Sequence, residues 1–312
     1  MRHQLLFPLT IALTLTACAT APEARETREA PSREGRLVAP APDADLRVWT
    51  YVATPWGFET NTFFVEGPTG LVAVDTQFLP SAAAEAIAKV EAATGKEVVF
   101  AIVLHPNPDK FNGTATLRAR GVRVVTSAQV AERIPEVHAL RKSWFYDRYA
   151  PDYPEEAAAP EVFGDETTTL TAAGLDLTLH VMGPGISDAQ VVVEVGGHVF
   201  TGDLVANGTH SWLELGLLDA WRARLDEISA LSPRAVHPGR GASGGPELLA
   251  AEREYLDVVE ARVAAARPEG EPTRPEIMKI RADIEARYPG YGYGVFLRVG
   301  LPAVWKTVAA RD

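Results

Sequence analysis

A polar stretch at residues 105–113 follows directly after an apolar run at residues 98–104, and these two segments constrain the fold more than any other part of the chain. An apolar run of that length, rich in β-branched residues, predicts a buried strand. Pro106 and Pro108 disfavour helix in the residues before them, so the polar stretch should begin as an extended loop. Ligands and chemistry collect at the carboxyl ends of strands in α/β sheets. The side chains of this loop are therefore candidates for a functional site.

The same loop carries a partial sequence signature. His105, Asp109 and Gly113 fit the pattern H-x-H-x-D-H-x-x-G of the metallo-β-lactamase superfamily, while Asn107 and Lys110 stand at two of its histidine positions. The loop therefore resembles the metal-binding loop of that superfamily, with part of its ligand set replaced.

Three later turns resemble further elements of that pattern, in the same order. Residues 184–187 are similar to its P-G-H-[ST] turn, with Ile186 at the histidine position. Residues 201–203 are similar to its G-D element, whose aspartate here is Asp203. Residues 238–241 are similar to its P-G-H-G turn, with Arg240 at the histidine position. Each motif is weak alone, but together, in order and at predicted strand ends, they make the resemblance specific.

The resemblance implies an α/β fold, an αββα sandwich of two mixed β-sheets flanked by helices. Strands and helices also alternate over residues 71–125 with short connections, which is itself typical of the α/β class. The apolar spacing after residue 246 predicts extra C-terminal helices, at residues 246–266, 276–288 and 301–310. We expect a single domain over residues 46–312, with its helical extension starting at about residue 246.

The resemblance also implies which residues would hold metal. Seven positions of the family bind two zinc ions, and only His105, Asp109 and Asp203 keep a usual ligand. Stable zinc sites need three or four protein ligands, with nitrogen or sulfur predominating. We therefore favour no cofactor. The alternative is one zinc or other divalent transition metal on these three residues, helped by His210 or His237.

Two cations, Lys110 and Arg240, stand where the second metal position has its histidines. A divalent ion about 5 Å from one fixed positive charge is repelled by several kcal/mol even at an effective dielectric of about 20, and arginine cannot lose its proton. We hypothesise that these charges replace the metals and neutralise Asp109 and Asp203, which are otherwise costly to bury. The alternatives are that Lys110 extends to solvent and that Arg240 caps a carbonyl group.

The candidate pocket residues suggest two classes of function. Positive charge in the pocket favours binding of a small ligand, an anionic one among the candidates, or of a protein partner. The alternative is a hydrolase of the ester, thioester or lactam class, using one metal or His105 as a base oriented by Asp109 or Asp203. The fold alone selects no substrate. We expect the pocket to be lined by Asn107, Lys110, Ile186, Asp188, His210, His237 and Arg240.

Three further histidines and an aromatic stretch are interpreted from their local sequence. His138 is expected on the surface of a helix, His180 at a solvent-facing position of a strand, and His198 on the surface beside a hairpin turn. Residues 143–156 contain five aromatic side chains, which either pack a loop onto the domain or form a rim over the pocket.

The first residues of the chain predict a lipid anchor. A short basic start precedes an apolar stretch at residues 5–15 that is too short to span a bilayer. Residues 15–18 resemble the lipobox of bacterial lipoproteins, which implies a signal peptide at residues 1–17 and lipidation of Cys18. Ala19 resembles the residue found in lipoproteins sorted to the outer membrane, facing the periplasm. The alternative is an ordinary cleaved signal peptide. Residues 18–45 contain few large apolar side chains and predict a disordered tether.

Composition excludes several partners. The formal net charge is −11 with no run of Lys and Arg, which argues against nucleic acid and against a basic patch on anionic lipid. Membrane contact is expected only through the lipid anchor. The single cysteine rules out a disulfide within the chain and a cysteine-rich metal site.

Overall fold

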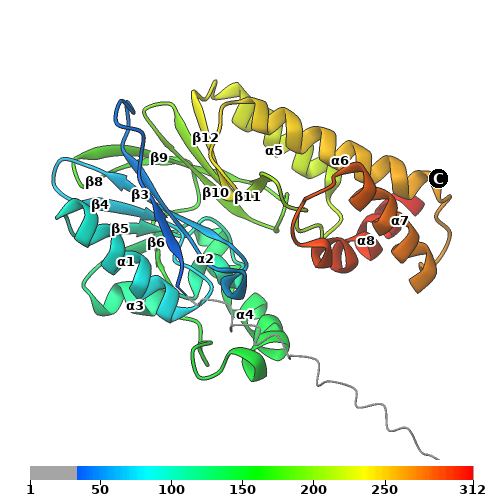
Figure 1. Ribbon diagram of the computed structural model, residues 1–312, viewed down its shortest axis with the longest axis horizontal. Coiled ribbons are helices and arrows are strands. Elements are labelled where there is room, and N and C mark those ends of the chain that lie inside the picture. The colour runs from blue at the N-terminus through cyan, green and yellow to red at the C-terminus, as the bar shows by residue number, and fades with distance from the viewer. Residues whose placement is uncertain (1–33, 312) are drawn as a thin grey trace, which may run out of the picture. The chain divides into compact units, whose positions relative to one another are not determined.

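The computed structural model describes residues 34–311, which form two β-sheets packed face to face between layers of helices (Figure 1). The predicted signal peptide, the lipid anchor at Cys18 and the first part of the tether lie outside the described residues and stay predictions. Among residues 34–311, no helix combines the length and hydrophobicity needed to cross a bilayer.

The first sheet has seven strands that lie side by side in chain order. Its first four strands pair antiparallel and its last four pair parallel, with β4 belonging to both halves, so the sheet is mixed. The strands are β1 (Arg36–Val38), β2 (Val48–Val52), β3 (Asn61–Glu66), β4 (Leu71–Val74), β5 (Val98–Ile102), β6 (Arg123–Thr126) and β7 (Glu161–Val162).

The second sheet has five strands in the order β12-β11-β10-β9-β8. Only β11 and β12 pair parallel, so this sheet is mixed as well. The strands are β8 (Thr168–Ala172), β9 (Leu175–Met182), β10 (Gln190–Val195), β11 (His198–Ala206) and β12 (Ala235–Arg240).

The core between the sheets comes from the strands that are apolar on both faces. Five of the six residues of β3 and all four of β4 are buried, because helices cover one face and the second sheet covers the other. The rings of Phe63 on β3 and Phe200 on β11 meet across the interface at 5.4 Å. The backbone N–H of Val191 donates to the carbonyl of Leu104 at 2.7 Å, which ties the two sheets together.

Helices cover both outer faces, which confirms the predicted αββα sandwich. In Figure 1, α1 (Pro80–Thr94) and α3 (Thr114–Ala119) lie under the first sheet, and α5 (Leu218–Ala230) and α6 (Glu247–Ala265) lie along the second. Ala83, Ile87 and Val90 of α1 join the core of the first sheet. The remaining helices on the first-sheet side are η1 (Pro55–Gly57), α2 (Pro108–Phe111) and α4 (Ala128–Tyr149).

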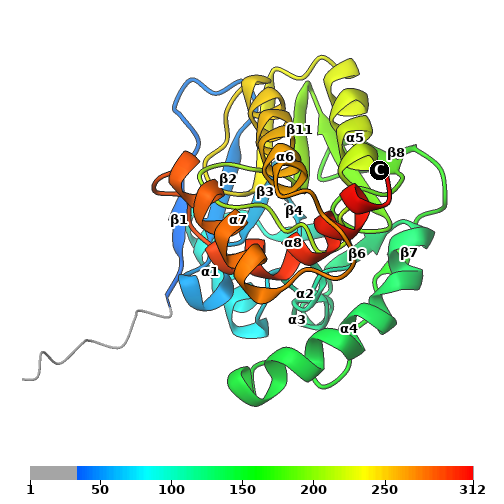
Figure 2. The same cartoon turned by 90° about the vertical axis from the view of Figure 1, so that its right-hand side faces the viewer.

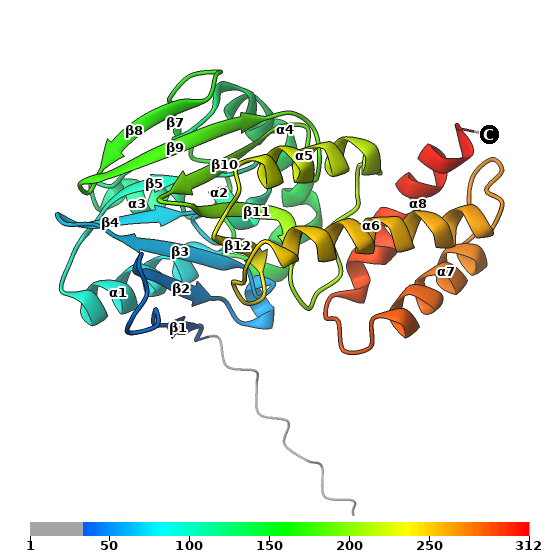
Figure 3. The same cartoon turned by 90° about the horizontal axis from the view of Figure 1, so that it is seen from above.

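The predicted C-terminal helices are present. α6 is followed by α7 (Arg274–Arg287) and α8 (Gly294–Ala309). Figure 3 shows α6, in gold, running from the second sheet outward, with α7 and α8, in orange to red, beyond the end of the sheets. Leu256, Ile284 and Leu301 bury their side chains where these helices meet. α8 begins seven residues before the predicted start at residue 301, since Phe296 and Leu297 also turn inward.

The folded part begins earlier than predicted. β1 pairs with β2, Lys89 Nζ donates to the carbonyl of Gly35 at 2.6 Å, and Asp45 Oδ1 lies 3.0 Å from His198 Nε2. The prediction of a disordered tether is therefore wrong for residues 34–45. Backbone hydrogen bonds to an edge strand hold this segment, and the composition of side chains carries no sign of them.

Two histidine predictions are also wrong. His138 is buried on α4 against Tyr153 and Phe111, and His198 is buried at the start of β11 against His237. His138 was expected on the surface because charged residues surround it in the sequence, and His198 because it lies beside a predicted turn. Their burial comes from segments that are distant along the chain.

A buried carboxyl group joins the helical extension to the second sheet. Glu252 on α6 accepts a hydrogen bond from the Ala206 N–H at 3.0 Å and from the Ser211 hydroxyl at 2.7 Å. Burial raises the pKa of Glu252 to about 7, against the smaller opposing effect of these two donors. The folded state therefore holds this proton more tightly than the unfolded chain does.

We predict that Glu252 makes the protein less stable as the pH rises. A carboxyl group with a raised pKa favours folding below its unfolded pKa, and this contribution is lost as the pH passes through the folded value. From about pH 5 to about pH 8, the unfolding free energy of the wild type should fall by about 2–3 kcal/mol relative to Glu252→Gln. Urea unfolding of both proteins across this range measures the difference, and parallel pH profiles would contradict the assignment.

Candidate functional site

Two carboxylates and two cations form a compact group at the edge of the two sheets. Lys110 Nζ lies 3.0 Å from Asp109 Oδ2 and 2.8 Å from Asp203 Oδ1. Arg240 donates from Nη2 to Asp109 Oδ2 at 2.8 Å and from Nη1 to Asp203 Oδ2 at 2.5 Å. Each carboxylate thus contacts both cations. We call Asp109, Lys110, Asp203 and Arg240 the ion-pair cluster.

Strand ends from both sheets assemble this cluster. Asp109 and Lys110 lie in the short helix α2, just after β5, while Asp203 lies on β11 and Arg240 at the end of β12. Gly239 makes the close approach possible, because a Cβ at this position would lie 2.0 Å from Asp203 Oδ1. The turn at residues 238–241 therefore needs glycine here whether or not a metal binds.

Burial makes the pairing essential to the charged state of each group. The Lys110 side chain is fully inaccessible to solvent. Burial alone lowers its pKa, but the nearby carboxylates of Asp109 and Asp203 outweigh burial and hold the pKa above its usual range. Burial raises the pKa of Asp109 and of Asp203, and the two cations overcome this and lower both values. All four groups are therefore charged at neutral pH, and their charges sum to zero.

Two further buried groups beside the cluster stay uncharged. Burial raises the pKa of Asp75 to about 8, although Lys110 lies 3.8 Å away and the Leu104 N–H donates to it. Burial lowers the pKa of His105 to about 4, and its Nε2 lies 3.7 Å from Asp203 Oδ2, beyond hydrogen-bond distance. The site as a whole therefore carries almost no net charge at pH 7.

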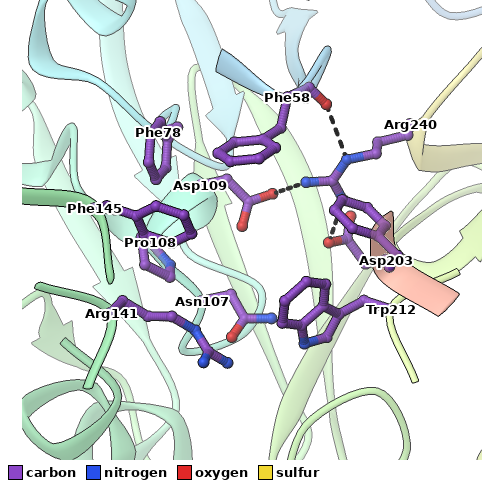
Figure 4. Close-up of a pocket in the computed structure, with 11 residues that line it drawn as sticks. Phe58, Phe78, Asn107, Pro108, Asp109, Arg141, Phe145, Asp203, Trp212 and Arg240 are labelled. Carbon is purple, nitrogen blue, oxygen red and sulfur yellow. Dashed lines mark hydrogen bonds and ion pairs between the residues drawn. The ribbon is translucent and has the colours of Figure 1, made fainter. Parts of the chain in front are cut away.

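An open pocket lies in front of the cluster (Figure 4). Its cavity volume is about 40 Å³, and the space in front of it is partly open to solvent. In Figure 2, α2 lies between α4 and α8, which both contribute to the wall. The residues that line this aromatic pocket are Phe58, Phe78, Asn107, Pro108, Asp109, Arg141, Phe145, Asp203, Trp212, Arg240 and Phe296.

The second arginine of the pocket is paired with a carboxylate of its own. Arg141 on α4 forms a bidentate pair with Glu214, and the Trp212 indole N–H donates to the same carboxylate at 3.0 Å. The guanidinium carbon of Arg141 lies 4.3 Å from the ring centre of Trp144 and 5.3 Å from that of Trp212. Neither arginine of the pocket therefore offers an uncompensated positive charge.

Four of the predicted pocket and catalytic residues line the pocket: Asn107, Asp109, Asp203 and Arg240. Lys110 and His105 lie behind them, fully buried, so the prediction that Lys110 faces the pocket is wrong. The alternative in which Lys110 extends to solvent is wrong as well. Ile186 packs in the core of the second sheet, where its apolar side chain joins Leu204 and Val205.

Three further residues predicted for the pocket lie elsewhere. Asp188 is exposed and pairs with Arg133 at 2.6 Å. His210 is buried against α6, with Nδ1 3.0 Å from the Tyr255 hydroxyl. His237 contacts His198 and Ser243 in a separate groove. Neither histidine joins His105, because the loop after β11 turns toward the helical extension and the β12 side chain points to the other side of its strand.

Most of the residues in the pocket wall are not predicted from the sequence. Phe58 follows the short helix η1, Phe78 follows β4, and Phe296 belongs to α8, the C-terminal extension. The aromatic stretch at residues 143–156 has both suggested roles: Phe145 lines the pocket, whereas Tyr149 and Tyr153 pack against Phe78. The one sequence feature that indicated an aromatic pocket wall was the density of aromatic residues on α4.

The donor set does not fit a metal ion. A metal between Asp109 and Asp203 would meet the ammonium of Lys110 and the guanidinium of Arg240, which already contact both carboxylates. Among the residues that the structure describes, His105 is the one imidazole beside them, and Asn107 and Ile186 add no usual zinc ligand. Among residues 34–311, no group of three or more His, Cys, Asp or Glu side chains is arranged to bind a metal.

Comparison with known proteins agrees with the predicted sandwich. The family model described as the metallo-beta-lactamase superfamily matches residues 55–240. The chain belongs to the metallo-β-lactamase superfamily. The matched region begins at η1 and ends at Arg240, so the C-terminal helices lie outside it. No curated protein matches the chain.

Several solved structures share this superfamily fold. A metallo-beta-lactamase from Pontibacter korlensis is 20% identical, with a TM-score of 0.56 over 71% of this chain and 99% of the other. The metallo-beta-lactamase FIM-1 from Pseudomonas aeruginosa, in its mono-zinc form, is 18% identical, with a TM-score of 0.55 over 73% and 98%. A metallo beta lactamase from Hirschia baltica is 20% identical, with a TM-score of 0.52 over 71% and 97%. At this identity the likeness concerns the fold alone.

We predict that Arg240→Ala destabilises the protein by about 3–5 kcal/mol, because Asp109 and Asp203 lose a buried partner and keep their desolvation penalty. The matched control is Arg123→Ala, which removes an exposed pair with Glu161 and should cost less than about 1 kcal/mol. Chemical unfolding of the three proteins measures both effects. Equal losses in the two variants would argue against a structural role for the cluster.

Proposed function

We propose that this chain is a metal-independent member of the superfamily that binds a small, largely apolar molecule in the aromatic pocket. The observation that carries the proposal is the position of Lys110 and Arg240, which compensate the two retained carboxylates from the side where the family pattern has metal ligands. The chemistry of a zinc-activated water is therefore not part of the proposed activity.

The pocket wall supports an uncharged ligand with a flat apolar part. Five of its residues are aromatic, and aromatic rings contribute large contact areas with specific stacking geometry. The two arginines and their carboxylate partners balance in charge, so an anionic group gains no free cation here. The earlier expectation of an anionic ligand is accordingly the less favoured version of this proposal.

Asn107 is the polar group best placed to select the ligand. It lies at the start of α2 and lines the pocket, and its side-chain amide makes no hydrogen bond to another residue within the described part of the chain. An amide offers both a donor and an acceptor. A ligand with a carbonyl or amide group beside an aromatic ring would use both features of the pocket.

The hydrolase alternative receives less support. A general base must come within hydrogen-bond distance of the proton it takes. His105 is 1% exposed and does not line the pocket, and Gly202 lies close to its ring. Its lowered pKa keeps the imidazole neutral, but its place behind the carboxylates separates it from a bound molecule.

Ligand binding can be tested with a library of uncharged aromatic fragments, screened by thermal shift and by ligand-observed NMR. We predict that Phe145→Ala weakens the fragments that bind by about tenfold, which corresponds to about 1.4 kcal/mol. Leu140→Ala is the matched control, because Leu140 is exposed on the same helix and does not line the pocket. Anionic fragments that bind in preference to uncharged ones would contradict the proposed ligand class.

Metal independence can be tested by mass spectrometry of metals after incubation with zinc and removal of free ions. We predict less than about one tenth of an equivalent in the wild type, since an added divalent ion meets two fixed positive charges. The variant with Lys110→His and Arg240→His removes both charges and should retain more zinc. Stoichiometric zinc in the wild type would overturn the proposal, and equal low contents would show that the cations are not what excludes the ion.

A further inference from the structure

A second group of polar side chains forms a continuous chain of contacts away from the aromatic pocket. The Ser243 hydroxyl lies 2.8 Å from His237 Nδ1. His237 Nε2 lies 3.0 Å from His198 Nδ1, and His198 Nε2 lies 3.0 Å from Asp45 Oδ1. We call Ser243, His237, His198 and Asp45 the serine relay. Its members come from the segment before β2, from β11, from β12 and from the turn after β12.

The direction of the hydrogen bonds in this relay follows from the carboxylate of Asp45 at one end. The Asp45 carboxylate only accepts, so His198 Nε2 carries a proton and donates it. In neutral imidazoles, His198 Nδ1 then accepts from His237 Nε2, and His237 Nδ1 is left as an acceptor. Ser243 therefore donates its hydroxyl proton to His237. This is the arrangement in which a histidine activates a serine nucleophile.

The relay opens onto a groove that could hold a substrate. The groove has a cavity volume of about 450 Å³, is partly open to solvent, and shares no lining residue with the aromatic pocket. His198, His237 and Ser243 line one side, and short apolar residues such as Val38, Ala41 and Leu46 line the other. Ser243 itself is exposed, so its oxygen is accessible to a molecule in the groove.

We propose that Ser243 is a nucleophile for acyl transfer from carboxylic esters with an aliphatic acyl group. The apolar side of the groove would hold the acyl chain, and the solvent-open side would accept the alcohol portion. This activity is separate from ligand binding in the aromatic pocket and uses none of its residues.

The proposed step balances without a cofactor. Ser243 Oγ attacks the ester carbonyl carbon as its proton passes to His237 Nδ1, while the Nε2 proton of His237 passes to His198 Nδ1. The tetrahedral intermediate then collapses, the bond to the alcohol oxygen breaks, and the proton returns through His237 to that oxygen. Water attacks the acyl-serine through the same sequence and releases the carboxylic acid.

The surroundings of the two histidines give them different roles in the proton transfer. His237 is buried, with its ring stacked against Phe200 at 4.4 Å and packed against Phe63, and this burial away from water disfavours a positive charge. Transfer of its second proton moves the charge to His198, which contacts the Asp45 carboxylate. Arg234 pairs with the other oxygen of Asp45 at 2.5 Å and holds it in place. His198 and Asp45 are thus positioning residues that act through His237.

The experiment uses a fluorophosphonate probe and intact-protein mass spectrometry of the full chain. The wild type should gain one phosphonyl group on Ser243, and it should release p-nitrophenol from p-nitrophenyl butyrate. Ser243→Ala should abolish both, whereas Ser229→Ala, which removes an exposed serine on α5, should change neither. An unlabelled wild type, or equal labelling of Ser243→Ala, would overturn the proposal.

Two substitutions separate proton transfer from simple hydrogen bonding. His198→Gln and Asp45→Asn keep side chains that can hydrogen-bond but cannot carry the transferred charge or stabilise it. Each should lower the second-order labelling rate at least tenfold while the melting temperature stays within about 2 °C of the wild type. A wild-type labelling rate in both variants would contradict the relay, even if Ser243 itself reacts.

Discussion

The buried pairing of Asp109 and Asp203 with Lys110 and Arg240 is the interaction on which the site depends. Two carboxylates placed at the strand ends need positive charge nearby, because an unpaired charge at this depth is strongly unfavourable. Metal ions supply that charge in the family pattern that the loops resemble. Here two side chains supply it, and because arginine cannot lose its proton, the compensation is permanent.

Arg240 also fixes the pocket in front of the cluster. Its three guanidinium nitrogens contact Asp203, Asp109 and the carbonyl of Phe58, and its planar group lies 5.3 Å from the ring of Phe296. One side chain therefore joins β12, β11, α2 and the segment after η1. The base of the pocket is therefore the charge-balanced ion-pair cluster, and its sides are aromatic. This arrangement favours apolar contact with a ligand over attraction of an ion.

β12 takes part in two different environments. Arg240 at its end faces the aromatic pocket, while His237, three residues earlier, faces the groove of the serine relay. Side chains alternate across a strand, so neighbouring positions of one element reach opposite sides of the sheet. The sandwich thus has a second candidate site, and this site uses none of the residues at the metal-ligand positions of the family pattern.

Sequence alone was sufficient for the sandwich, through the family resemblance of the strand-end motifs, and for the C-terminal helices, through their apolar spacing. It was also sufficient for the pairing of Asp109 and Asp203 with Lys110 and Arg240, because unpaired charge is costly to bury. It was insufficient for the pocket wall, since Phe58, Phe145 and Phe296 lie far apart in the chain and no local pattern links them. It also misjudged His198, His210 and His237, whose neighbours in the sequence are not their neighbours in space. Local pattern decides which segments become strands and helices and which charges must be matched, whereas only the packing of distant segments decides which side chains meet in a cavity.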